Sequence, residues 1–117
     1  MHHKDLEVWK YSMDLVVEIY KETESFPKEE MFSLTSQMHR CAVSIPSNIA
    51  EGCGRYSDKE TSRFISVALG SLAELDTQII LAERLGYLKS HNRIIEDIKK
   101  TNALLIGLKK HLEKCIE

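Results

Sequence analysis

Hydrophobic positions recur along most of the chain at spacings of three and four residues, as on one face of an α-helix. Three breaks divide this pattern: Phe26-Pro27, the Gly52-Cys53-Gly54 segment, and Gly86. A residue before proline is pushed out of the helical region, and glycine after a helix favours the left-handed conformation that ends it. The pattern predicts four helices, over residues 5–24, from Ser33 or Thr35 to 54, from Ser57 to 85, and from Ser90 to 116, with a short turn over residues 28–32.

Each predicted helix carries one apolar stripe that we assign to a common core. Short connections between helices of this length favour an all-α, up-down-up-down antiparallel four-helix bundle in a single domain over residues 1–117. The predicted core stripes are Leu6, Trp9, Met13, Val16 and Tyr20 in the first helix; Leu34, Met38, Cys41, Ile45, Ile49 and Gly52 in the second; Phe64, Ala68, Leu72, Leu75, Ile79 and Ala82 in the third; and Ile94, Ile98, Thr101, Leu105, Leu108, Leu112 and Cys115 in the fourth.

Pro46 falls inside the second predicted helix. Its ring nitrogen has no hydrogen to donate to the carbonyl four residues earlier, so the helix either kinks there or ends and restarts. The apolar stripe keeps its phase from Ile45 to Ile49, which favours the kink.

The third predicted helix is apolar over more than half its circumference, which indicates burial on more than one side. A second copy of the chain would explain the extra surface, and so would the loop over residues 26–32. We favour the homo-oligomer. Its predicted interface on this helix is Ile65, Leu69, Ala73 and Ile80.

A polar stripe follows the second predicted helix beside its core stripe. Three interpretations stay open: an ordinary solvated boundary, a hydrogen-bonded network at a helix or subunit contact, and a ligand or RNA contact. The stripe consists of Gln37, Arg40, Ser44, Asn48, Glu51 and Arg55.

Composition places the chain in a broad class. With 117 residues, 43% apolar and 29% charged, the chain suits one globular domain and is neither disordered nor membrane-spanning. Its three cysteines have no Cys-x-x-Cys spacing and follow no secretory signal, which leads us to expect reduced thiols in the cytoplasm.

Charge is unevenly distributed although its sum is only −2. Residues 1–30 hold four Lys against eight Asp and Glu, whereas residues 89–117 hold seven basic and four acidic groups. The total charge does not describe a strongly basic nucleic-acid binder. The uneven charge fits ordinary solvated helix faces, which we favour, but a dipolar chain can also assemble head to tail or present one basic face.

Motifs for catalysis are missing from the sequence. No Glu precedes His39, His91 or His111 by three residues, as a di-metal bundle site requires. Gly52-Cys53-Gly54-Arg55 lacks the strand and the GK[ST] of a phosphate loop. We expect no catalytic residues, metal, cofactor or small-molecule substrate.

Several longer segments carry a family resemblance. They include Leu6-Glu7-Val8-Trp9, Phe26-Pro27-x-x-Glu30, Leu34-Thr35-x-Gln37-Met38-x-Arg40-Cys41-Ala42-Val43, Ser44-Ile45-Pro46-Ser47-Asn48-Ile49-Ala50-Glu51-Gly52, Phe64-x-x-x-Ala68-x-Gly70-Ser71-x-x-Glu74-Leu75 and Leu85-Gly86-Tyr87-Leu88. Together they resemble the four-helix bundle proteins of 23S rRNA intervening sequences, a family that has also carried a ribosomal-protein label.

The resemblance implies an antiparallel bundle that assembles as a ring, typically a pentamer. It also implies kinship with the accessory variability determinant of diversity-generating retroelements, a basic pentamer that binds RNA and a reverse transcriptase. Two hypotheses follow: a non-enzymatic oligomeric scaffold for a protein or RNA partner, including an RNA-processing protein, and a direct binder of structured RNA such as rRNA. The candidate RNA contacts are Arg40, Arg55, Arg63, Lys99, Lys100, Lys109 and Lys110.

Overall fold

The computed structural model describes residues 1–88 and 92–116, and this part of the chain is all-α, with four helices and no strand. The helices are α1 (Glu7–Thr23), α2 (Leu34–Cys53), α3 (Asp58–Arg84) and α4 (Asn92–Lys114). Two short 3-10 turns, η1 (His3–Asp5) and η2 (Lys28–Glu30), precede α1 and α2. The four predicted helices are confirmed, although the predicted start at Ser90, with His91 after it, lies outside the described residues.

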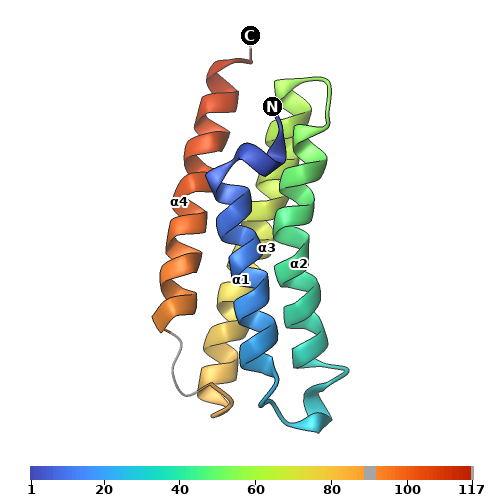
Figure 1. Ribbon diagram of the computed structural model, residues 1–117, viewed down its shortest axis with the longest axis vertical. Helices are drawn as coiled ribbons and strands as arrows, with labels where there is room; N and C mark the ends of the chain where they lie inside the picture. The colour runs from blue at the N-terminus through green and yellow to red at the C-terminus, as the bar shows by residue number, and fades with distance from the viewer. Residues whose placement is uncertain (89–91, 117) are drawn as a thin grey trace.

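The helices pack side by side as a bundle of 49 × 24 × 20 Å. α1 and α3 each contact both α2 and α4. Figure 1 shows the α1–α2 connection at one end of the bundle and the α2–α3 connection at the other end, where both termini also lie. α2 therefore has two long flanks, one toward α1 and one toward α3, and these flanks carry the surfaces described below.

The ends of α3 follow the sequence signals. The Ser57 hydroxyl accepts a hydrogen bond of 3.2 Å from the Glu60 amide, which caps the first turn. Gly86 adopts a φ of +80°, and the Tyr87 amide then donates to the Ala82 carbonyl over 2.9 Å. Ser33 differs from Ser57: it precedes α2, but its hydroxyl donates to the Glu30 carboxylate instead of capping the helix.

α2 continues without interruption through Pro46. The alternative in which the helix ends and restarts is therefore wrong, while the kink stays a prediction. Pro46 is buried on the side of α2 that faces α1.

The predicted core stripes of α2, α3 and α4 are largely confirmed. Every predicted residue of the α2 stripe is buried. Three residues depart from the prediction: Phe64 and Leu108 are half-buried and Cys115 is exposed. Ile65 joins the core of α3, and Val8, Leu15 and Ile19 supply the large side chains from α1.

The predicted core stripe of α1 is only partly confirmed, because Leu6, Trp9 and Val16 pack against the edge of the core whereas Met13 and Tyr20 do not. Met13 and Tyr20 are 41% and 44% exposed, and Leu6, Trp9 and Val16 are only half-buried. The buried positions of α1 are instead Val8, Ser12, Leu15, Ile19 and Thr23.

Two hydroxyl groups explain why the core side of α1 was missed. Ser12 donates to the Trp9 carbonyl over 2.7 Å, and Thr23 donates to the Ile19 carbonyl over 2.9 Å. Because each hydroxyl bonds to its own helix, it can be buried without leaving an unpaired polar group. The apolar stripe is thereby left at the edge of the core, with Met13 and Tyr20 exposed.

Candidate functional site

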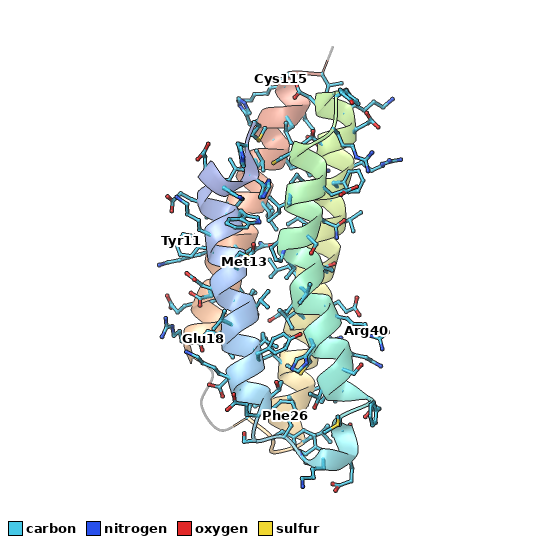
Figure 2. The ribbon with its side chains drawn as sticks, turned by 45° about the vertical axis from the view of Figure 1, so that its right-hand side comes forward. Tyr11, Met13, Glu18, Phe26, Arg40 and Cys115 are labelled. Carbon is cyan, nitrogen blue, oxygen red and sulfur yellow. The ribbon has the colours of Figure 1, made fainter. Side chains whose placement is uncertain are left out.

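The displaced stripe of α1 forms an apolar surface together with α2. A hollow of about 320 Å³ lies between the helices, lined by Trp9, Met13 and Val16 on one side and by Val43 and Pro46 on the other. Figure 2 shows Met13 on the side of α1 nearest α2, whereas Arg40 projects from the opposite side of α2. We call this surface the α1–α2 face. It consists of Trp9, Met13, Val16, Val43, Pro46 and Ala50, which line the hollow, together with the exposed Val17 and Tyr20, which lie one helical turn beyond Met13 and Val16 on α1.

A histidine closes one end of the α1–α2 face. The His39 ring stacks on Tyr20 with 3.8 Å between ring centroids, and its Nε2 lies 2.8 Å from the Thr23 hydroxyl oxygen. Since that hydroxyl donates to the Ile19 carbonyl, Nε2–H of His39 is the donor toward Thr23. Burial lowers the pKa of His39, so the ring is neutral at pH 7 and suits an apolar surface.

The other flank of α2 is polar and packs against α3. Cys41 donates its thiol hydrogen to the Ser71 carbonyl over 2.9 Å, and the Ser44 hydroxyl bonds to the Ser71 hydroxyl. Asn48 donates to the carbonyl of Ser44 over 2.7 Å. Part of the polar stripe therefore forms a hydrogen-bonded connection between α2 and α3 inside one protomer.

The remaining residues of the polar stripe are turned toward solvent. A second hollow of about 320 Å³ lies over the hydrogen bond between Ser44 and Ser71, and it is bordered by Gln37, Arg40 and Glu74. Arg40 donates a hydrogen bond of 3.2 Å to the Ser36 hydroxyl of its own helix. The stripe thus divides into an internal part around Ser44 and an exposed part.

The polar stripe ends in a closely packed corner where α2 meets α3. A Cβ at Gly52 would lie 2.9 Å from the Cβ of Phe64, so only glycine permits this approach. Thr61 donates its hydroxyl to the Gly52 carbonyl over 2.7 Å. Arg55 and Arg63 both lie over the Phe64 ring, at 4.7 and 5.7 Å from its centroid.

The candidate RNA contacts on α4 do not join this corner. Lys99 lines a groove between α3 and α4, whereas Lys100 lies 5.4 Å from the ring centroid of Tyr11 on α1. Lys109 forms an ion pair of 3.0 Å with Glu113, and Lys110 is exposed. Of the seven candidates, the structure brings together Arg55 and Arg63.

The predicted interface on α3 needs one correction. Ile65 is fully buried in the protomer's own core and offers no surface to a second copy. Leu69 is half-buried, while Ala73 and Ile80 are exposed. The reason is that α3 packs against both α2 and α4 of the same chain, which together cover much of its wide apolar surface.

α3 also meets the length and hydropathy requirements of a membrane span, with a mean hydropathy of 1.4 over its most apolar window. A third of that window is buried inside the bundle. Core helices of bundles meet the same requirements, and Glu74 and Asp76 interrupt the apolar run. This finding is therefore weak evidence for a membrane segment.

Groups suited to covalent or metal chemistry are few. Burial raises the pKa of the Cys41 thiol to about 11, so it stays protonated at neutral pH. Within residues 1–88 and 92–116, no group of three or more His, Cys, Asp or Glu side chains could hold a metal ion. The surfaces described above therefore offer packing and hydrogen bonding.

Two features of these surfaces could not be located from the sequence. The α1–α2 face was visible as an apolar stripe, but its periodicity did not show that it points outward. The contact of Phe64 with Arg55 had no signal in the spacing, because Arg55 lies in the loop before α3 whereas Arg63 and Phe64 are neighbours within α3.

The fold places the chain among all-α four-helix bundle proteins. A family model described as 23S rRNA-intervening sequence protein matches residues 4–107, and the chain belongs to this family. The match covers α1, α2, α3 and most of α4. A search of curated proteins found no match. The family is consistent with a role associated with rRNA and is not a known family of enzymes.

Proposed function

We propose that the protein is a non-enzymatic, self-assembling scaffold: an antiparallel four-helix bundle that forms a homo-oligomeric ring and holds a protein or RNA partner. The observation that carries this proposal is the α1–α2 face. Val17 and Val43 are 53% and 41% exposed beside the half-buried Trp9 and Val16. Large contiguous apolar surfaces are rare on monomeric proteins and mark interaction sites.

A ring requires two different surfaces on each protomer, because one copy must contact its two neighbours through different sides. The exposed remainder of the predicted α3 interface, Ala73 and Ile80, supports a second surface beside α4. α1 and α3 each contact α2 and α4, so they lie diagonally across the core from each other. The side formed by α1 and α2 is therefore opposite the side formed by α3 and α4. The five-fold ring rests on the family resemblance.

Light scattering of the full chain tests the assembly. A particle mass of at least three times 13.4 kDa supports the proposed ring, and a monomer at micromolar concentration overturns it. Val43→Glu and Gln37→Glu form a matched pair, because both place a carboxylate at an exposed position of α2 but on opposite flanks. Val43→Glu dissociates the oligomer, whereas Gln37→Glu leaves its mass unchanged.

Direct binding of structured RNA through a broad basic surface receives less support from the arrangement of charges. Lys99 and Lys100 contact different neighbouring helices, and Lys109 is paired with Glu113. Affinity for duplex nucleic acid follows the number of phosphates that clustered cations neutralise. We therefore place the scaffold first and any RNA contact at a local site.

A further inference from the structure

The α2–α3 corner, which comprises residues 51–64, exposes an aromatic ring that the protomer does not use. Tyr56 is fully exposed, and no ring contact or hydrogen bond of its side chain occurs within the described part of the chain. It lies in the four-residue connection between α2 and α3. An aromatic ring held entirely in water is available to stack on a flat partner group.

The same corner holds two cations, which lie over the ring of Phe64. Arg55 stacks on Phe64 and pairs with Glu51 over 2.6 Å, so its guanidinium has a fixed position. Arg63 also lies over Phe64, and no carboxylate among the described residues pairs with it. Planar guanidinium groups fixed in this way suit phosphate oxygens and base faces.

The backbone of the corner is anchored at several points. On the α2 side, Gly52 closely approaches Phe64 and its carbonyl accepts a hydrogen bond from Thr61. On the α3 side, Ser57 caps the helix. A site that is already ordered loses less entropy when a ligand binds.

The charge around the corner favours a short, unpaired ligand over a duplex. The formal charges of the corner sum to zero, because its three acidic side chains, Glu51, Asp58 and Glu60, equal in number its three basic ones, Arg55, Lys59 and Arg63. The corner therefore has no net positive charge. Long-range attraction to the dense phosphates of a duplex needs such a charge. Stacking on an exposed aromatic ring, by contrast, requires an unpaired base.

We propose that the α2–α3 corner binds unpaired RNA, with a base stacked on Tyr56 and the adjoining phosphates held by Arg63 and Arg55. This inference rests on the proposed scaffold function, since it assigns the partner class and the surface that holds it. An acidic peptide could use the arginines, but it would gain nothing from the Tyr56 ring.

The test is a binding titration in which the full chain is added to a labelled single-stranded RNA and binding is measured by the fluorescence anisotropy of the label. The RNA has about six nucleotides, which is short enough to occupy one corner. The matched variants are Tyr56→Ala and Arg63→Ala inside the corner and Arg40→Ala outside it. An RNA hairpin of equal charge and a polyglutamate peptide serve as comparison ligands.

The expected result is that the single strand binds more tightly than the hairpin and the peptide. Tyr56→Ala and Arg63→Ala weaken binding at least fivefold, whereas Arg40→Ala does not change it. Because two arginines meet phosphates, the logarithm of affinity falls by about 1.4 for each tenfold rise in salt. Failure to bind at low salt overturns the inference, as does binding that both corner variants leave unchanged.

Light scattering on the same samples separates this inference from the proposed function. An assembled protein that does not bind the RNA overturns the inference alone. A monomeric protein that binds it through Tyr56 and Arg63 supports the corner site and overturns the oligomeric scaffold.

Discussion

Replacing Gly52 with alanine adds one methyl group at the closest contact between α2 and α3. The new Cβ would lie 2.9 Å from the Cβ of Phe64 and 3.3 Å from the carbonyl oxygen of Thr61. Carbon atoms attract best at about 3.5–4.0 Å, so the contact with Phe64 is repulsive, and the contact with the Thr61 oxygen is tight. Neither neighbour is the free end of a flexible side chain, and the helices must therefore separate at this corner.

The magnitude follows from two opposing effects. Overpacking of this kind costs about 1–3 kcal/mol, while alanine gains up to about 1 kcal/mol over glycine through helix propensity. The gain is small here because Gly52 lies in the last turn of α2. We expect a net destabilisation of about 1–2 kcal/mol, which corresponds to a fall in Tm of roughly 4–10 °C.

Thermal unfolding followed by circular dichroism at one fixed protein concentration measures this effect. Gly107→Ala is the matched control, because Gly107 lies inside α4 and a Cβ there meets no atom within 4 Å. The control is expected to gain about 0.5–1 kcal/mol from helix propensity alone. If Gly52→Ala is as stable as Gly107→Ala, the close contact with Phe64 does not exist in solution.

Three further predictions concern single groups. Pro46→Ala should keep the helical circular dichroism and raise Tm, because the helix already continues through this position and proline is unfavourable inside it; a loss of helicity would contradict the continuous α2. Hydrogen bonds from Ser33 and Tyr87 lower the pKa of the Glu30 carboxyl below its ordinary value of 4.5. The ionised carboxylate therefore contributes fully to folding stability above pH 4.5, and this contribution is lost as the pH falls through the pKa of Glu30 in the folded protein. Glu30→Gln should therefore have a lower Tm than the wild type at pH 7, and the difference in Tm should shrink toward pH 3 when both proteins are melted under the same conditions. A difference in Tm that does not change with pH would contradict this ionic role. With its pKa near 11, the buried Cys41 thiol should react with a thiol reagent at pH 8 far more slowly than the exposed Cys115, and equal rates in single-cysteine variants would contradict its burial.

The sequence predicted the helices well because their end signals are local. Ser57 caps α3 and Gly86 ends it by contacts within a few residues, so neighbouring helices were not needed to identify them. The core stripes of α2 and α4 were equally clear, since each recurs at spacings of three and four residues along its helix. The position of Pro46 inside a continuous helix followed from the unbroken phase of the α2 stripe.

The sequence could not decide which side of α1 faces the core. Two stripes compete there, and the outward one holds larger apolar side chains than the inward one, which includes Ser12 and Thr23. Only the packing of α1 against α2 and α4 selects between them. The same limit applies to α3, where Ile65 is covered by the chain itself rather than by a second copy. An apolar stripe thus predicts burial but does not identify the partner.

The central proposal is that the α1–α2 face is covered by another copy of the chain. Sedimentation equilibrium of the wild type, Val17→Glu and Gln37→Glu at several micromolar concentrations tests it directly. We expect the wild type and Gln37→Glu to sediment as one oligomer and Val17→Glu to sediment at 13.4 kDa with unchanged helicity. A monomeric wild type, or an oligomer that Val17→Glu leaves intact, would contradict the proposal.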